Sequence, residues 1–270
     1  MIKNLRIDEL DATMVASMEG EKYYPRLALS NRKPNHLIAS TRFDSDIPLP
    51  YYNWSWTMYL EDPPHNGKNV WSENNIQRSH VPFSQVKKAA VFIARNCNSK
   101  SGRESLVKSL MAKMPVDSVS SCLHNFDIGD KKDKMKMMRK YAMYFAFENQ
   151  RVDDYITENL WKTFRAGVLP VYFGAPNIKE HVPENSIVHV DDFESHDALV
   201  SHLNAILSDE DLYNSYHAWR SKPLPTWFVA LYVRVTIYDP VSPKMKLKQR
   251  KQVQFHTCSF TVSYLSMGIS

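Results

Sequence analysis

The sequence lacks any long apolar run. Its longest apolar segments, such as residues 227–233, fall far short of the roughly 20 apolar residues that a transmembrane helix needs. The amino-terminal residues carry charges in every turn and lack the apolar core of a signal peptide. On this evidence alone, nothing in the chain is predicted to span a bilayer, and a soluble protein is expected.

Cysteine is scarce, and basic residues are not gathered into blocks. Three cysteines, Cys97, Cys122 and Cys258, are too few for a disulfide scaffold and lack metal-ligand spacing, so no metal site is predicted. The odd number leaves the redox compartment open. A net charge of +5 without basic blocks interleaved with aromatics argues against nucleic acid as a partner. A basic groove for a phosphate-bearing small molecule fits the charge equally well.

Short apolar runs alternate with helical patterns. The strand-like runs are residues 36–41, 89–94, 141–147, 168–173 and 186–190, and apolar residues spaced by three and four mark helices within 102–113 and 156–166. This alternation predicts an α/β fold with a parallel sheet. In such sheets ligands bind beyond the carboxyl ends of the strands, so the turns that follow the strands are where chemistry is expected.

Turn and breaker residues precede Ser84 and predict a boundary there, which divides residues 1–84 from a second domain of residues 85–225. The tail, residues 226–270, combines a strand-like run, a basic stretch and a Ser/Thr-rich end. It is either an added strand or sequence that does not fold with the rest. The basic run 131–140 is interpreted as the solvated face of a helix or loop.

One segment, residues 147–177, has the pattern of a buried strand, a polar loop, an amphipathic helix, a second strand and a Gly-Ala-Pro turn. Asp153 and Asp154 stand where a helix N-cap is expected, and Gly167 is the predicted stop. The start of that helix would offer free backbone N–H groups and a positive dipole end to an anion. From spacing alone, a generic β-loop-α-β unit without a ligand remains an equal alternative.

The residues of this segment resemble a known family signature. Phe-Glu-Asn at 147–149, Tyr-Ile-Thr-Glu at 155–158, Gly-Val-Leu-Pro-Val at 167–171 and Gly-Ala-Pro-Asn at 174–177 resemble the donor-site signature of the α-1,3/4-fucosyltransferases, glycosyltransferase family 10. Residues 17–24, 45–50, 91–103 and 121–125 resemble the plant-type core α-1,3-fucosyltransferases. The resemblance covers roughly residues 12 to 222.

The resemblance implies a GT-B architecture, with two Rossmann-like domains and parallel sheets. Residues 1–84 would be a partial, incomplete acceptor-side domain and residues 85–225 the GDP-fucose-binding domain. The implied activity is inverting transfer of L-fucose from GDP-fucose to a GlcNAc hydroxyl of a glycan or glycoprotein, in α-1,3 linkage, with the N-glycan core as the favoured acceptor. No metal or other cofactor is implied as obligatory. Family members are anchored in the Golgi membrane, and that anchor is missing from this sequence.

The resemblance also assigns residues to roles. Glu19 falls where the family has its general base, Arg103 where an arginine contacts the diphosphate, and Glu158 where an acid bonds the ribose. The full set of implied donor-site residues is Arg103, Asn149, Tyr155, Glu158, Asn159, Gly174, Ala175 and Pro176. Taken without the motifs, Glu19 is better interpreted as a solvated carboxylate. The alternative for Arg103 is a surface arginine on a helix, and Tyr155 is equally a core aromatic.

Asn159 departs from the family pattern, which has lysine there reaching the donor phosphates. A lost charge-assisted hydrogen bond is worth roughly 1.5 to 3 kcal/mol, or about ten- to a hundredfold in donor binding or turnover. Lys162, one helical turn beyond Glu158, could partly substitute. The alternative is a truncated or donor-impaired, non-catalytic relative that binds a sugar or nucleotide. If the chain enters the secretory pathway, the family motifs imply that Cys97 and Cys122 pair; otherwise they are buried thiols.

Overall fold

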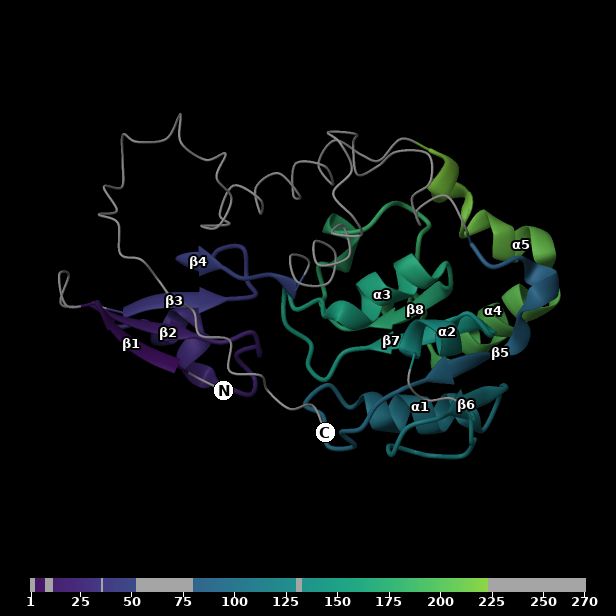
Figure 1. Ribbon diagram of the computed structural model, residues 1–270, viewed down its shortest axis with the longest axis horizontal. Coiled ribbons are helices and arrows are strands. Elements are labelled where there is room, and N and C mark those ends of the chain that lie inside the picture. Colours follow the sequence, from purple (N-terminus) through teal and green to yellow (C-terminus); the bar gives the residue numbers. More distant parts are fainter. Residues whose placement is uncertain (1–2, 8–11, 35, 52–79, 130–132, 223–270) are drawn as a thin grey trace.

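The computed structural model describes residues 3–7, 12–34, 36–51, 80–129 and 133–222, and the strands they form make two sheets that lie side by side (Figure 1). The elements are β1 (Lys3–Ile7), β2 (Ala12–Ala16), β3 (His36–Ser40), β4 (Ile47–Pro48), β5 (Lys87–Phe92), α1 (Arg103–Met111), β6 (Val116–Ser118), α2 (Lys134–Met138), β7 (Tyr141–Phe147), α3 (Glu158–Ala166), β8 (Leu169–Phe173), β9 (Val188–His189), α4 (His196–Ser208) and α5 (Glu210–Ser215). From β5 to β8, strands and helices alternate, as the periodicity predicts.

The first sheet has the strand order β1-β2-β3-β4. The β1 strand is antiparallel to β2, whereas β2, β3 and β4 run parallel to one another. Three buried residues, Val15, Leu27 and Ile38, form a small core of its own. The loop after β2 starts with a hydrogen bond from Ser17 N to Ala39 O, 3.0 Å, which holds the beginning of that loop against β3.

The second sheet has the order β6-β5-β7-β8-β9, and all its pairings are parallel. From β5 the chain moves outward to β6, then returns to the other side of β5 as β7. The strand order therefore reverses between β5 and β7, and ligands in open α/β sheets bind beyond the carboxyl ends of the strands at such a point. The loops after these two strands, residues 93–102 and 148–157, are thus placed for binding.

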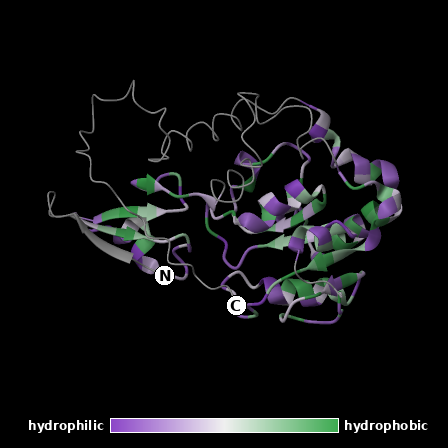
Figure 2. Ribbon diagram, in the orientation of Figure 1, coloured by the Kyte–Doolittle hydropathy of each residue, from purple (hydrophilic) through white to green (hydrophobic). Residues whose placement is uncertain are grey.

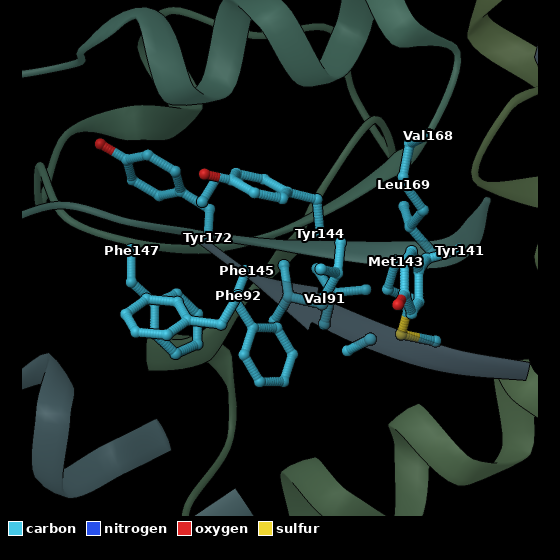
Figure 3. Close-up of a cluster of buried hydrophobic side chains, with 14 of the residues drawn as sticks. Val91, Phe92, Tyr141, Met143, Tyr144, Phe145, Phe147, Val168, Leu169 and Tyr172 are labelled. Atoms are coloured by element: carbon cyan, nitrogen blue, oxygen red, sulfur yellow. The ribbon is translucent and has the colours of Figure 1, made fainter. Parts of the chain in front are cut away.

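Helices cover both faces of this sheet. The α3 helix packs on β7 and β8 and contacts α2, whereas α4 packs on β5 and contacts α1. Side chains alternate between the two layers (Figure 3): Tyr144 and Tyr172 point toward α3, and Phe145 and Phe147 point to the opposite face. Every residue of β7 is buried, which explains its continuous apolar run. Figure 2 shows the same distribution, with hydrophobic residues along the strands and hydrophilic residues on the outer helix surfaces.

The predicted α/β class with a parallel sheet is confirmed, but the predicted start of α3 is wrong. Neither Asp153 nor Asp154 caps this helix. Thr157 is the N-cap, and its side chain accepts a hydrogen bond from Asn159 N. Three potential caps lie within five residues, and the Asp154 carboxylate is taken by other partners, described below. The predicted stop is confirmed, because Gly167 adopts a left-handed conformation with φ 69°.

The basic run 131–140 is only partly a solvated face. Within it, Met137 and Met138 of α2 are buried in the core. Lys134 Nζ donates to Asn159 Oδ1 of α3 at 2.5 Å, whereas Lys136 and Lys140 are exposed. Residues 130–132 and the tail 226–270 lie outside the described residues, so the expectations for the tail stay predictions. The same holds for a domain division at Ser84.

Among the residues that the structure describes, no helix combines the length and apolar character that crossing a membrane requires. The same residues contain no group of three or more His, Cys, Asp or Glu side chains placed to hold a metal ion.

Candidate functional site

Three loops meet where the two sheets approach each other. They follow β2, β5 and β7, and Glu19, Lys100 and Asn149 belong to them in that order. The backbone O of Asn149 accepts hydrogen bonds from Lys100 N, 2.7 Å, and Ser101 N, 3.0 Å, which joins the loops after β5 and β7. Side chains join the loop after β2 to the loop after β7.

Glu19 is clamped by two residues of the loop after β7. Tyr155 OH donates to Glu19 Oε2 at 3.0 Å, and Gln150 Nε2 reaches the same oxygen at 3.4 Å. Burial, with the acidic groups nearby, raises the pKa of Tyr155 well above its usual range, so the phenol remains a donor. Both donors reach Oε2, so among the described residues Oε1 is the oxygen of Glu19 that is left to accept another proton.

Gln150 was missed by the sequence analysis. It is fully buried, and its side chain lies directly against Gly20. A Cβ atom at Gly20 would come within 2.4 Å of Gln150 Oε1, so only glycine allows this approach without displacement. The signal in the sequence was the glycine that directly follows Glu19, but the partner that requires it lies 130 residues away along the chain.

Asp154, in the loop after β7, connects this loop to the segment between β3 and β4 of the first sheet. Its Oδ2 accepts from Phe43 N, 2.9 Å, while its Oδ1 accepts from Asn177 Nδ2, 2.8 Å, and lies 3.0 Å from His181 Nε2. The Phe43 and His181 rings stack at 5.4 Å. Burial raises the pKa of Asp154, but its hydrogen bonds outweigh burial and hold the pKa below the ordinary value. The carboxylate therefore stays charged, in a left-handed residue with φ 62°, next to Tyr155.

Glu148 ties the end of β7 to the start of α3. Its two carboxyl oxygens accept from Thr157 N and Thr157 Oγ1, each at 2.8 Å. Complete burial raises the pKa of Glu148 to about 8, although the hydrogen bonds from Thr157 oppose this shift. Thr157 is also the cap of α3, so the buried carboxyl holds the residue that positions Glu158 and Asn159.

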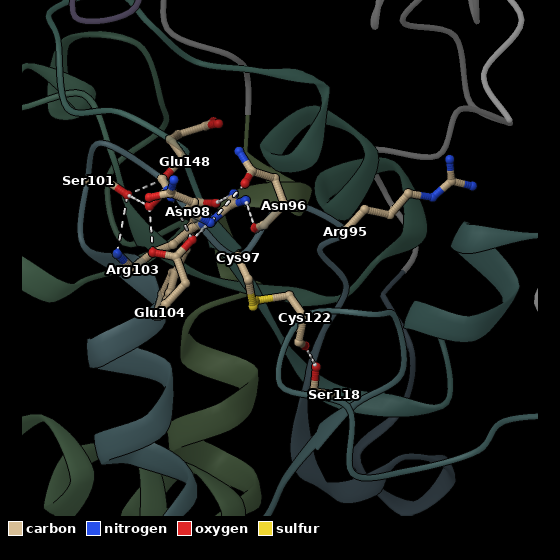
Figure 4. Close-up of polar contacts among 12 residues, drawn as sticks. Arg95, Asn96, Cys97, Asn98, Ser101, Arg103, Glu104, Ser118, Cys122 and Glu148 are labelled. Carbon is tan, nitrogen blue, oxygen red and sulfur yellow. Dashed lines mark hydrogen bonds and ion pairs between the residues drawn. A yellow bond between two sulfur atoms is a disulfide. The ribbon is translucent and has the colours of Figure 1, made fainter.

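Arg103 is buried, not the surface arginine of the alternative reading. Its guanidinium donates to the backbone oxygens of Phe147, 2.8 Å, and Asn96, 3.1 Å (Figure 4). Its Nε lies 3.5 Å from Glu104 Oε1. Arg103 thus braces the loops after β5 and β7 against each other. Its contact with a diphosphate stays a prediction.

The Gly-Ala-Pro turn, residues 174–176, packs against Glu148 and Tyr172. A Cβ atom at Gly174 would come within 2.5 Å of both Glu148 Cγ and Tyr172 OH, so this turn needs glycine. Ala175 N donates to Tyr172 OH at 2.9 Å and Ala175 is buried, whereas Pro176 is exposed. The turn therefore packs behind Glu148, and Pro176 lies at its outer edge.

Asn149 carries an unsatisfied polar atom. Its Oδ1 is buried and has no hydrogen-bond partner within the part of the chain that the structure describes. Buried polar atoms usually have partners. Together, these contacts bring Glu19, Tyr155 and Asn149 to the junction of the loops after β2, β5 and β7. Arg103 lies buried beneath that junction and joins the loops after β5 and β7.

Comparison with known sequences identifies the family. A profile described as glycosyltransferase family 10 (fucosyltransferase) C-term matches residues 83–261 of the 270-residue chain. The chain belongs to glycosyltransferase family 10. The predicted family is thereby confirmed.

Relatives and solved structures agree with this family. The chain is 39% identical over 196 residues to Alpha-(1,3)-fucosyltransferase B of Drosophila melanogaster, covering 67% of this chain and 42% of that protein. It is 33% identical over 234 residues to GDP-fucose protein O-fucosyltransferase 3 of Homo sapiens, covering 69% of this chain and 49% of that protein. The chain thus spans less than half the length of these two relatives.

A solved α1,3-fucosyltransferase with GDP-fucose shares the fold, with a TM-score of 0.62 and 15% identity, covering 87% of this chain and 78% of that one. The likeness supports a GT-B-like arrangement for this family 10 chain, as the resemblance implied. One strand departs from the expected pattern of parallel sheets, because β1 runs antiparallel to β2.

A disulfide joins Cys97 to Cys122 (Figure 4), which is the pairing that the family motifs imply. It closes a loop with a sequence separation of 25 that contains Arg103 and α1. We expect the double substitution Cys97→Ser/Cys122→Ser to lower the free energy of unfolding by roughly 2 to 4 kcal/mol, measured by urea denaturation. Cys97→Ser alone should give most of this loss, and an unchanged unfolding midpoint in both variants would contradict it.

Proposed function

We propose that this chain transfers L-fucose from GDP-fucose to a hydroxyl group of an acceptor, with inversion at the anomeric carbon. The observation that carries the proposal is the clamped carboxylate of Glu19. Its Oε2 accepts hydrogen bonds from Tyr155 OH at 3.0 Å and Gln150 Nε2 at 3.4 Å, which fixes the carboxylate at the junction of the loops. A general base needs this fixed geometry and a free acceptor oxygen.

The chemistry of inverting transfer fits the residues around Glu19. One face of the sugar carbon is attacked by the acceptor hydroxyl as its proton passes to Glu19, while the bond to the diphosphate breaks on the opposite face. The departing diphosphate gains negative charge, which nearby cations or backbone N–H groups stabilise. The start of α3, with Glu158 for the ribose, supports donor binding next to Tyr155. No metal is needed for these steps.

For the acceptor we propose a GlcNAc hydroxyl of an N-glycan core, giving an α-1,3 linkage. This assignment rests on the plant-type motifs at 17–24, 45–50 and 91–103, and the relative named Alpha-(1,3)-fucosyltransferase B is compatible with it. A second candidate acceptor is a protein hydroxyl. The relative named GDP-fucose protein O-fucosyltransferase 3, 33% identical over 69% of this chain, favours that alternative.

We also propose that the protein works in the oxidising lumen of the secretory pathway, in the Golgi. The Cys97–Cys122 disulfide supports this location, because disulfides persist in oxidising compartments and are rare in the cytosol.

The test is release of GDP from GDP-fucose by the purified full chain with three additions: an N-glycan with an unfucosylated chitobiose core, a folded protein with accessible Ser and Thr hydroxyls, and buffer. Release that depends on the N-glycan supports the first acceptor, and release that depends on the protein supports the second. Binding of GDP without release for any acceptor would instead favour the non-catalytic, nucleotide-binding alternative, which Asn159 motivates.

A further inference from the structure

The segment between β3 and β4 of the first sheet contacts two residues of the second sheet's loops. Phe43 N donates a hydrogen bond to Asp154 Oδ2 at 2.9 Å, and the Phe43 ring stacks on the His181 ring, with 5.4 Å between the ring centres and 15° between the planes. Asp154 Oδ1 and His181 Nε2 lie 3.0 Å apart, and only 11% and 5% of these two side chains are exposed. Water therefore screens the Asp154–His181 pair little, and the pair holds Phe43 by both its backbone and its ring.

Asp154 also fixes the backbone next to Tyr155. Its φ of 62° lies in the left-handed region, which few residues other than glycine adopt. The Asn177 side chain holds this conformation, because its Oδ1 accepts from Asp154 N at 3.0 Å and its Nδ2 donates to Asp154 Oδ1 at 2.8 Å. The next residue is Tyr155, whose OH donates to Glu19 Oε2 at 3.0 Å. One residue thus both contacts the first sheet's segment and sets the chain direction at Tyr155.

The segment that contains Phe43 is joined to the loop that carries Glu19. Ser17 N donates to Ala39 O at 3.0 Å, which holds the start of that loop on β3. Ser17 Oγ in turn accepts from Glu19 N at 3.0 Å. Because Phe43 follows β3 directly along the chain, a displacement of Phe43 from Asp154 is transmitted through the end of β3 to the backbone of Glu19.

We propose that Asp154 and His181 are positioning residues that set the place of the Glu19 carboxylate relative to the donor. They act through Glu19, by holding Phe43 and by orienting Tyr155. The inference rests on the proposed function, since it takes Glu19 to be the base. Glu19 belongs to a loop of the first sheet and the start of α3 to the second, so contacts between the two sheets decide how the acceptor hydroxyl meets the anomeric carbon. A misplacement of about 1 Å can cost on the order of a hundredfold in rate.

Asp154→Asn tests the pair with the least change in shape, because asparagine tolerates the left-handed conformation. In either orientation of the new amide, its NH₂ group faces a donor, Phe43 N on one side or Asn177 Nδ2 on the other, so one hydrogen bond is lost. We expect the turnover number of the full chain to fall on the order of tenfold to a hundredfold. The Kd for GDP, measured by calorimetry, should stay nearly unchanged, because Glu148 and Thr157 still hold the start of α3.

The matched control is Asp153→Asn, which neutralises the exposed carboxylate next to Asp154 and should keep the turnover number within about twofold. His181→Phe approaches the pair from its other side. It keeps a ring to stack on Phe43 and removes the nitrogen that contacts Asp154, so it should lower the turnover number by a smaller factor than Asp154→Asn does.

Combination with Glu19→Gln separates positioning from general damage. Because the pair acts through Glu19, Asp154→Asn should change the residual turnover number of the Glu19→Gln variant by less than about threefold. Hydrogen exchange, followed by mass spectrometry of the full chain, detects the contact without catalysis. In Asp154→Asn, exchange should become faster in residues 17–24 and 36–46 and stay unchanged in β7.

Three results would overturn the inference alone: an unchanged turnover number in both Asp154→Asn and His181→Phe, a loss in Asp154→Asn that is equally large in the Glu19→Gln background, or unchanged exchange in residues 17–24. Thermal unfolding identifies a misfolded variant, and if Asp154→Asn misfolds, His181→Phe takes its place in each comparison. If the unsubstituted chain transfers fucose to no acceptor, the proposed function itself fails and the role of the pair in transfer fails with it, whereas hydrogen exchange still decides whether the pair holds the loop of Glu19.

Discussion

Glu19→Gln is expected to lower the turnover number for fucosyl transfer by about 10² to 10⁴, the usual contribution of a general base, while the Kd for GDP changes little. The substitution keeps one oxygen to accept from Tyr155 OH, which lies 3.0 Å from Glu19 Oε2, so the clamp survives and the ability to accept a proton is lost. Initial rates at saturating GDP-fucose and acceptor measure the first quantity, and calorimetry with GDP measures the second.

Glu21→Gln is the matched control, because it neutralises a half-buried carboxylate two residues further along the same loop. It should keep most of the activity. If Glu19→Gln retains more than about a tenth of the turnover number, Glu19 is not the base. If the affinity for GDP falls in parallel with the turnover number, the substitution has disturbed the junction of the loops after β2, β5 and β7. The assignment of Glu19 as the base is then not supported.

Between about pH 4.5 and 8, the free energy of unfolding should fall as Glu148 ionises. Complete burial raises its pKa from the ordinary 4.5 to about 8, so the folded protein binds this proton more tightly than the unfolded chain. The stabilising contribution is fully present below about pH 4.5 and is lost as the pH rises through about 8. Over this interval the loss is on the order of 3 to 5 kcal/mol.

Glu148→Gln isolates this contribution, because it is nearly isosteric and does not titrate. Urea denaturation at pH 5, 6.5 and 8 should show a stability difference, variant minus unsubstituted protein, that grows with pH. Glu184→Gln, at an exposed carboxyl between β8 and β9, should leave the slope unchanged. Parallel pH profiles for the unsubstituted protein and Glu148→Gln would mean that Thr157 keeps the Glu148 carboxylate ionised throughout.

The sequence by itself determined the second sheet and the segment that carries the family signature. The run at Tyr141–Phe147 is apolar at every position because both faces of β7 are covered. A strand that is buried on both faces can therefore be predicted from its own residues, without knowledge of its neighbours. The left-handed stop at Gly167 is equally local. The alternation of strands and helices is also visible in the sequence alone, and it predicts both the parallel strands and the positions of the loops that follow them.

Only the tertiary structure decided which residues meet. Tyr155 lies 136 positions from Glu19 along the chain, and Lys134 reaches Asn159 through the packing of α2 on α3. The N-cap shows the same limit. Asp153, Asp154 and Thr157 all have side chains that can cap a helix, but Thr157 caps α3, and the Asp154 carboxylate contacts Phe43 and His181 instead. Propensity and periodicity act over a few residues, whereas hydrogen bonds between distant loops form only after both sheets have packed.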